Sequence, residues 1–272
     1  MSTKIKKFQK YSSGMRKLIF DVYLKRGGHL STSFSCIEIL VSLHYGNFVK
    51  ISKNNYKNKN RNTFVLSKGH ADLAYYTLMF NLGLISKKIL YNKTNSEIFL
   101  LGGHVDHKIP GVELTTGSLG HGLSFSAGIS LAVKKNNKNY KQYVLLGDAE
   151  CSEGSVWEAA LFASYHKLGN LIAIIDRNNI GALDYLKNFT SLEPFKKKWE
   201  SFGWSVQEVN GHSITQLLES YKKCENSKKP NIIIANTIKG KGIKLLENSP
   251  IWHVKKLEDP TDILQAKKEL EK

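Results

Sequence analysis

The sequence has little cysteine and no long apolar run, and each shortage excludes a class of protein. Its three cysteines are Cys36, Cys151 and Cys224. Their odd number and irregular spacing fit neither a disulfide framework nor a zinc site, so we expect a reduced, cytoplasmic compartment. No apolar run reaches the roughly 20 residues that cross a bilayer, so we expect no membrane segment. The lysine-rich first ten residues lack an apolar segment behind them, so we expect no secretory signal.

Arginine is also scarce, which bears on the formal net charge of +17. Only four of the 40 basic residues are arginine, the side chain preferred for bidentate contacts with phosphates and bases. The lysines instead mix with asparagine in stretches 50–62 and 134–141, which is typical of solvated loops. We therefore expect no nucleic-acid partner. A positive field that attracts phosphorylated metabolites or an acidic partner chain explains the charge at least as well.

Helical and strand patterns alternate along the chain. Helical spacing of apolar residues predicts helices at 9–25, 71–82, 123–133, 156–168 and 214–222. A capping box of Ser35 and Glu38 predicts one more helix, which runs through Leu43. Short apolar runs predict strands at 64–66, 143–146, 171–175, 204–209 and 232–235. Buried strands separated by helices indicate an α/β fold, a doubly wound, mostly parallel sheet with helices on both faces. Without a repeat or a linker, we expect one domain over residues 1–272.

Oxygen-bearing side chains follow two of the predicted strands. Asp148 comes after strand 143–146, and Asn178 comes after strand 171–175. Because ligands bind at the carboxyl ends of parallel strands, these two side chains face one another if the strands are neighbours. Magnesium prefers hard oxygen ligands and shares itself with phosphates, and the carbonyl of Ile180 is a third candidate ligand. The alternative interpretation is that these are two ordinary polar strand ends.

A glycine-rich segment, residues 117–122, leads into the predicted helix at 123–133. Glycines let the backbone approach a ligand closely, and the N-terminus of a helix favours anions. By itself such a segment is weak evidence, because many glycine-rich loops are only tight turns.

Together these segments resemble a known family. The run from Gly147-Asp148 to Asn178 resembles the thiamine diphosphate motif, which begins with Gly-Asp-Gly and ends in asparagine. Further segments, in the same order along the chain, resemble transketolase specifically: 67–71, 103–104, 110–113, 116–120, 153–160, 167–174, 237–242, 247–248 and 252–253. The resemblance extends from about Gly14 to His253.

The resemblance implies an N-terminal, diphosphate-binding subunit of a split transketolase that uses thiamine diphosphate and Mg²⁺. The implied magnesium ligands are Asp148, Asn178 and the carbonyl of Ile180. The implied cofactor-binding residues are His70, Gly117, Ser118, Leu119, Gly147, Asp148, Ala149, Asn178 and His253. The implied catalytic residues are His29, His70, His104 and His253, as proton shuttles or hydroxyl partners of a sugar, and Glu153, which resembles the acidic residue that links cofactor sites across the subunit interface.

Several positions keep an ordinary interpretation or depart from the family pattern. Glu153 could simply be a glutamate favoured by the dipole at a helix N-terminus. We interpret the remaining histidines as surface or structural residues, at His44, His107, His166 and His212, and leave His121 undecided because glutamine is common there. The departures are Ala149 for the third glycine of the metal motif, Leu30-Ser31 for proline-glycine, and Ala182 for a larger hydrophobic residue.

The resemblance also implies what lies elsewhere. In transketolases, the glutamate that activates the cofactor's aminopyrimidine belongs to a second α/β domain. The nineteen residues after His253 read as a charged helix, so we expect the pyrimidine-binding domain on a partner chain, in an α2β2 heterotetramer. The expected reaction moves a two-carbon ketol unit between sugar phosphates or related sugars. Alternatives are a subunit of a 2-oxoacid dehydrogenase, a synthase of unusual sugars, or a non-catalytic subunit that binds the cofactor or nucleic acid.

Overall fold

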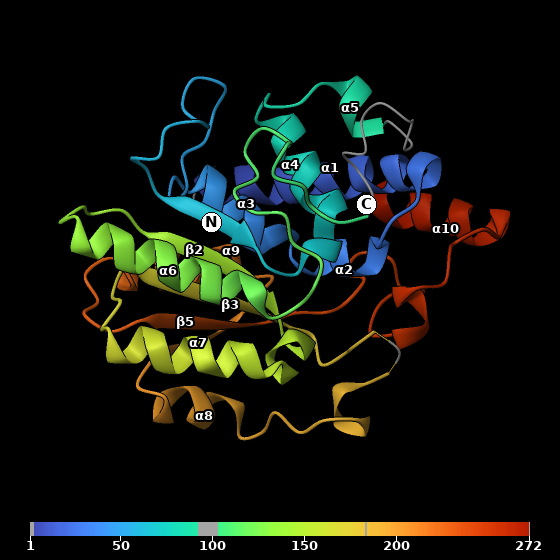
Figure 1. The fold of residues 1–272 in the computed structure, drawn as a ribbon. Coiled ribbons are helices and arrows are strands. Elements are labelled where there is room, and N and C mark those ends of the chain that lie inside the picture. Colours follow the sequence, from blue (N-terminus) through green and yellow to red (C-terminus); the bar gives the residue numbers. More distant parts are fainter. Residues whose placement is uncertain (1–2, 92–102, 183, 272) are drawn as a thin grey trace.

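A parallel sheet forms the centre of the molecule (Figure 1). The computed structural model describes residues 3–91, 103–182 and 184–271. Within these ranges the five strands lie in the order β1 (Thr63–Leu66), β2 (Gln142–Gly147), β3 (Leu171–Arg177), β5 (Asn231–Asn236) and β4 (Ser205–Asn210). All neighbouring pairs are parallel. All five predicted strands are therefore confirmed, to within a residue or two at their ends.

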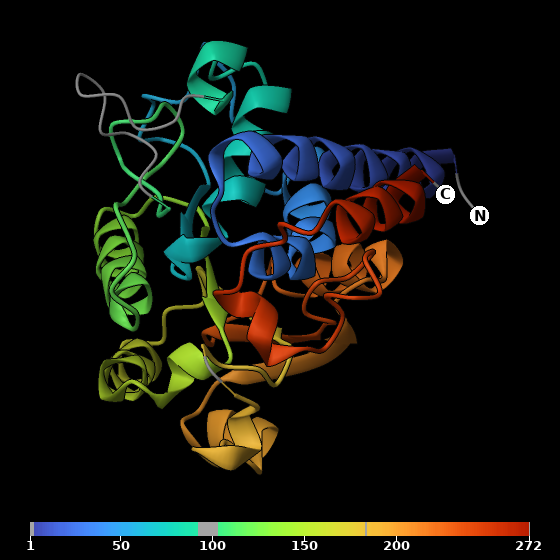
Figure 2. The same cartoon turned by 90° about the vertical axis from the view of Figure 1, so that its right-hand side faces the viewer.

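Helices cover both faces of the sheet, as Figure 2 shows edge-on. One face carries α1 (Thr3–Arg26), α2 (Leu30–Ser35), α3 (Ile37–Tyr45), α4 (Asp72–Asn81), α9 (Ile214–Lys223) and α10 (Pro260–Glu271). The other face carries α6 (His121–Lys135), α7 (Gly154–Tyr165) and α8 (Phe195–Ser201). A short helix, α5 (Lys87–Tyr91), packs beside α1 and α4. The predicted doubly wound α/β fold is confirmed.

Two separate hydrophobic cores follow from the alternation of side chains along each strand. In β3, Ile172 and Ile174 belong to the core under α1, α3 and α9, whereas Ala173 and Ile175 belong to the core under α6, α7 and α8. Successive strand residues point to opposite faces, so a strand buried on both faces must be apolar throughout. This is why the central strands β2, β3 and β5 are almost continuously apolar, whereas the edge strand β4 interleaves polar residues and is only partly buried.

The predicted capping box at Ser35 is wrong. Ser35 ends α2 and Ile37 begins α3, with Cys36 between them, and no side chain caps α3. The Ser35 hydroxyl instead donates to Asp176, and Glu38 forms an ion pair with Arg16. Long-range partners thus compete successfully for both side chains. Sequence patterns also gave no signal for α2, α5 and α8, which are short.

A buried ion pair joins α1 to α4. Arg26 donates to Asp72, and the two side chains are only 4% and 0% exposed. Burial raises the pKa of Asp72, whose other carboxylate oxygen has no hydrogen-bond partner. Removal of the arginine would leave a buried acid without compensation, which is the costly way to break such a pair.

We therefore expect Arg26→Ala to lower the free energy of unfolding by about 3–5 kcal/mol. The neighbouring Lys25→Ala is the control, because its ion pair with Asp21 is exposed and contributes about 0.5 kcal/mol or less. Urea titrations of both variants followed by circular dichroism measure the difference. Equal, small changes would contradict the role assigned to Arg26.

Candidate functional site

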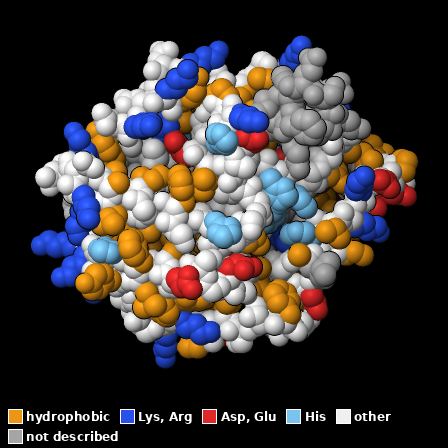
Figure 3. Space-filling model, viewed as in Figure 1, with side chains coloured by type: hydrophobic (Ala, Val, Ile, Leu, Met, Phe, Trp, Pro, Cys, Tyr) orange, Lys and Arg blue, Asp and Glu red, His pale blue; other side chains and the backbone are white. Residues whose placement is uncertain are grey.

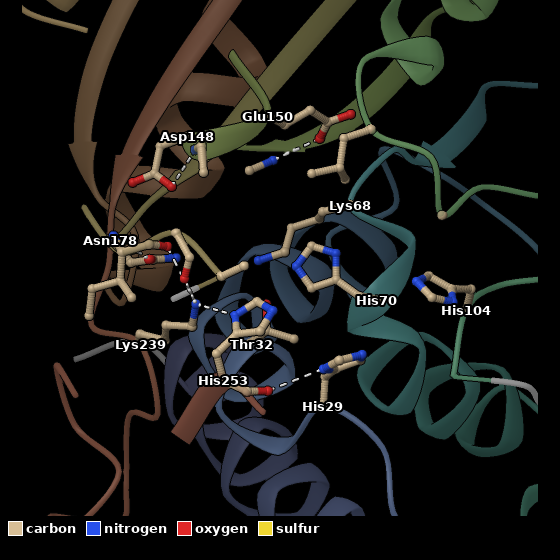
Figure 4. A pocket seen from close by; sticks show the side chains of 17 residues that line it. His29, Thr32, Lys68, His70, His104, Asp148, Glu150, Asn178, Lys239 and His253 are labelled. Carbon is tan, nitrogen blue, oxygen red and sulfur yellow. Dashed lines mark hydrogen bonds between the residues drawn. The ribbon is translucent and has the colours of Figure 1, made fainter. Parts of the chain in front are cut away.

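A cavity of about 330 Å³ opens at the carboxyl end of the sheet. Most of the residues singled out from the sequence line it: His29, His70, His104, Gly117, Leu119, Gly147, Asp148, Ala149, Asn178, Ile180 and His253. Figure 4 shows that the labelled side chains reach the cavity from several segments that are far apart in the sequence. Ser118 and Glu153 do not line the cavity.

The two candidate metal ligands lie on adjacent strand ends. β2 pairs with β3, with Gly147 opposite Asp176, so Asp148 and Asn178 both follow the paired residues. The Asp148 carboxylate accepts hydrogen bonds from the backbone N–H groups of Ala149 (2.8 Å) and Asn179. Burial still raises the pKa of Asp148 to about 6. The carboxylate therefore lies where its negative charge is poorly compensated by the protein itself.

Four histidines gather on the opposite side of the cavity. The ring centroid of His29 is 5.4 Å from that of His253, 5.7 Å from that of His70 and 6.1 Å from that of His104. Burial lowers the pKa of His70 well below its usual value, and burial together with Lys239 lowers that of His253 to about 3. These two rings are neutral at pH 7. Histidine side chains also gather on the face of the molecule drawn in Figure 3.

Two lysines of the cavity were missed by sequence reasoning. Lys68 forms a buried ion pair with Asp176. Lys239 is 2% exposed and donates to Nδ1 of His253 (2.7 Å) and to the carbonyl of Gly181 (3.2 Å). Burial and the nearby Lys68 lower the pKa of Lys239 to about 7. Lysines in glycine-containing loops are usually solvated, so only their place inside the family-like segments could have drawn attention to them.

Glu150 also lines the cavity and was not identified from the sequence. Its carboxylate is buried and accepts hydrogen bonds from the N–H groups of Gly120 (2.9 Å) and Gly147 (3.0 Å) and from the hydroxyl of Ser67. It therefore fixes the glycine-rich loop before α6 to the end of β2. The sequence places Glu150 two residues after Asp148, but gives no sign that it turns inward.

The departure at Leu30-Ser31 has a structural outcome. The Ser31 hydroxyl donates to the carbonyl of Trp252 (2.8 Å), and Nδ1 of His29 lies 3.2 Å from the carbonyl of His253. Two contacts thus hold the start of α2 against the segment that carries His253. The other two departures, Ala149 and Ala182, both line the cavity.

The remaining candidates lie outside the cavity. Ser118 and His121 are exposed. Glu153 is exposed at the start of α7, and its side chain does not cap that helix. The last four histidines agree with a surface or structural interpretation, since His44 is buried, His107 is exposed, His166 is partly exposed and His212 bonds to Glu38.

Comparison with known proteins decides the family. The sequence profile described as "Transketolase, thiamine diphosphate binding domain" matches residues 8–271. The chain belongs to the transketolase family. It is 41% identical to one of the subunits of an apulose-4-phosphate transketolase from Actinobacillus succinogenes, over 84% of this chain and 83% of the relative. It is 35% identical to a subunit of a 6-deoxy-6-sulfo-D-fructose transketolase from a Clostridium species, over 92% and 91%.

The fold agrees with this transketolase assignment. The solved transketolase of Campylobacter jejuni superposes with a TM-score of 0.89 and 30% identity. The comparison covers 100% of this chain and 43% of that chain. This chain therefore spans less than half the length of the solved transketolase.

The cavity of this transketolase chain suits a magnesium diphosphate. Among the described residues, no group of three or more His, Cys, Asp or Glu side chains could hold a metal ion by itself. Asp148 and Asn178 supply hard oxygens, which suffice for Mg²⁺ when phosphate oxygens complete its coordination. The two buried ammonium groups, Lys68 and Lys239, favour a polyanion, because only Lys68 has a carboxylate partner. A bound cation would in turn keep the Asp148 carboxylate ionised.

Glu150→Gln tests the arrangement of the glycine loops. In this variant the side-chain amide can accept from Ser67 and Gly120 with its oxygen. Its N–H₂ group then faces the N–H of Gly147, and this buried donor loses its acceptor. We expect a loss of about 1–3 kcal/mol in unfolding free energy and weaker thiamine diphosphate binding. Urea unfolding and fluorescence titration measure both. Glu158→Gln, at an exposed position on α7, is the control, and equal behaviour of the two variants would refute the role of Glu150.

Proposed function

We propose that this chain is the diphosphate-binding subunit of a two-subunit transketolase, which moves a two-carbon ketol unit between sugar phosphates or related sugars. The observation that carries the proposal is the cavity in which histidines face Asp148 and Asn178 (Figure 4). The two relatives named as transketolase subunits are matched over most of their length, which supports a separate partner chain for the pyrimidine-binding domain. An α2β2 heterotetramer is the proposed assembly.

In this proposal Asp148, Asn178 and the Ile180 carbonyl hold Mg²⁺ together with the cofactor's diphosphate. Gly117, Ser118, Leu119, Gly147 and Ala149 contribute backbone along the cofactor, and His70 and His253 lie beside its diphosphate. Lys68 and Lys239 neutralise the negative charge. Bound thiamine diphosphate supplies a nucleophilic carbon and an electron sink for cleavage of a carbon–carbon bond.

The hydrogen bonds of two histidines decide what each offers a sugar hydroxyl. Nδ1 of His29 donates to the carbonyl of His253, so in the neutral form of the ring Nε2 is an acceptor. Nδ1 of His253 accepts from Lys239, which places the ring proton of His253 on Nε2. The pair therefore presents one acceptor and one donor. With His70 and His104, these rings can orient the hydroxyl groups of a sugar. Because the pKa values of His70 and His253 are low, these two act at pH 7 as neutral hydrogen-bond partners. Glu153 is proposed to link cofactor sites across the subunit interface.

The proposed substrates are sugars with an anionic group. The names of the relatives specify apulose-4-phosphate and 6-deoxy-6-sulfo-D-fructose. A chain with a formal net charge of +17 attracts such substrates. The proposed location is the cytoplasm, in keeping with three free, buried cysteines. No described helix combines the length and the apolar character needed to span a membrane.

An exposed apolar surface supports a partner. Leu161, Phe162 and Tyr165 of α7 are 59%, 40% and 83% exposed, and Phe125 of the adjoining α6 is 40% exposed. We call these four residues the α6/α7 face. Such a face is costly to leave in water, and contiguous apolar patches mark protein interfaces. Both helices begin near the cavity, since Leu119, two residues before α6, lines it and the hydroxyl of Ser155 on α7 donates to the carbonyl of Gly120 (3.1 Å).

Co-purification and activity test the proposed function. The tagged chain is isolated with its bound protein and assayed for ketol transfer from ketose phosphates with thiamine diphosphate and Mg²⁺. We expect activity only when both chains are present, and a fall of more than about 100-fold in the assembled Asp148→Ala variant, with thermal stability little changed. Full activity of the wild-type chain alone would refute the split enzyme. Magnesium-dependent cofactor binding by Asp148→Ala equal to that of the wild type would refute the metal site.

Leu161→Glu tests the α6/α7 face. A charge at this position opposes burial against another chain, so we expect weaker assembly at an unchanged melting temperature of the isolated chain. Leu264→Glu on α10 is the control, at a similar exposure of 53%. Sedimentation measures the assembly: loss of the partner places the face between unlike chains, and retention of an αβ pair places it between two copies of this chain. Assembly equal to that of the control would contradict either location.

A further inference from the structure

A polar network lies behind the cavity and includes no residue that lines it. Arg16 on α1 forms a bidentate pair with Glu38 on α3, at 2.6 and 2.9 Å. Oε2 of Glu38, which accepts one of these two bonds, also lies 2.8 Å from Nδ1 of His212. The side chains of Arg16, Glu38 and His212 are only 11%, 9% and 15% exposed. Bidentate, buried pairs of this kind hold their geometry far better than surface ion pairs.

The network forms hydrogen bonds with one loop at two points. The N–H of Ile238 donates to Nε2 of His212 (2.9 Å), and Nε of Arg16 donates to the carbonyl of Lys241 (2.8 Å). Both contacts fall in residues 237–242, which we call the lysine loop. They lie on either side of Lys239. The backbone that carries this buried lysine is therefore fixed from outside the cavity, immediately before and shortly after it.

The position of Lys239 matters because its ammonium group reaches His253. Its Nζ donates to Nδ1 of His253 at 2.7 Å, the contact that places the ring proton of His253 on Nε2. A shift of the lysine loop would move that donor away from the ring. A chain of contacts thus runs from Arg16 and Glu38 through His212 to Lys239 and His253.

The two bonds of His212 require one particular form of its ring. A nitrogen that accepts from a backbone N–H carries no proton, so the ring proton lies on Nδ1 and is donated to Glu38. Among common side chains, asparagine reproduces a donor near the position of Nδ1, and glutamine reproduces an acceptor near the position of Nε2. Neither places both groups as the imidazole does.

We propose that His212, held by Glu38 and Arg16, is a positioning residue of the transfer reaction, which sets Lys239 against His253 through the backbone of Ile238. This inference rests on the proposed function. It assigns a role in turnover to a histidine that the sequence alone marks as surface or structural.

His212→Asn and His212→Gln test this role as a matched pair. Asparagine keeps the donor toward Glu38 but loses the acceptor for Ile238, whereas glutamine keeps that acceptor. In the assembled enzyme we expect kcat to fall about tenfold in His212→Asn, the change that loss of one ordinary hydrogen bond allows. The KM for the ketose should change little, and His212→Gln should recover most of the activity. Equal kcat values for the two variants would overturn the proposal.

Amide hydrogen exchange on the purified chain separates this inference from the proposed function, because it needs no catalysis. We expect exchange of the lysine loop to rise about tenfold in His212→Asn but not in His212→Gln, with β2 and β3 unchanged. Arg16→Lys, which retains a charge for Glu38 but loses the Nε donor to Lys241, should loosen the same loop if His212→Asn proves too unstable to study. Unchanged loop exchange in every variant would refute the network, even if the chain catalyses the proposed reaction.

Discussion

The carboxylate of Asp176 is the interaction on which the site depends. It lies at the end of β3 and accepts from Lys68 after β1, from Ser35 at the end of α2 and from Thr237 after β5. Burial by itself would raise the pKa of Asp176, but the Lys68 ammonium and these hydrogen bonds lower it. One ionised group therefore joins four segments that are far apart in the sequence. A parallel sheet brings strand ends to one edge, and Asp176 fixes how the loops leave that edge.

Charge in the cavity is unevenly matched. Lys68 has its carboxylate, but Lys239 is buried beside a neutral imidazole, and the Asp148 carboxylate is buried with only backbone donors. Isolated charges of either sign are costly in such surroundings. A ligand that brings both anionic oxygens and a divalent cation would compensate the charge of Lys239 and the charge of Asp148 together. The protein alone thus carries an electrostatic pattern complementary to a metal diphosphate, and this preorganisation is gained at some cost to its own stability.

Sequence patterns predicted the fold well because four of the five described strands are almost wholly buried and the long helices carry apolar residues at helical spacing. They placed the cavity correctly because Asp148 and Asn178 follow adjacent strands. They failed where a residue's partner is distant: Ser35 bonds to Asp176 rather than to a helix end. For the same reason Lys239 and Glu150 went unnoticed, since a loop lysine and a loop glutamate reveal their burial only in three dimensions.

The contact between His29 and His253 spans most of the described chain, because the two residues are 224 positions apart. Loops of this length close late, because local elements form before distant ones meet. One side of the cavity is formed by the ends of β2 and β3, and the other includes the segment around His253. During synthesis on the ribosome, β2 and β3 can pair before the segment around His253 has left the exit tunnel. The nascent chain therefore cannot hold a ligand between the two sides until the segment around His253 has emerged. Ligand binding between these two sides of the cavity therefore requires that the chain has folded as far as His253.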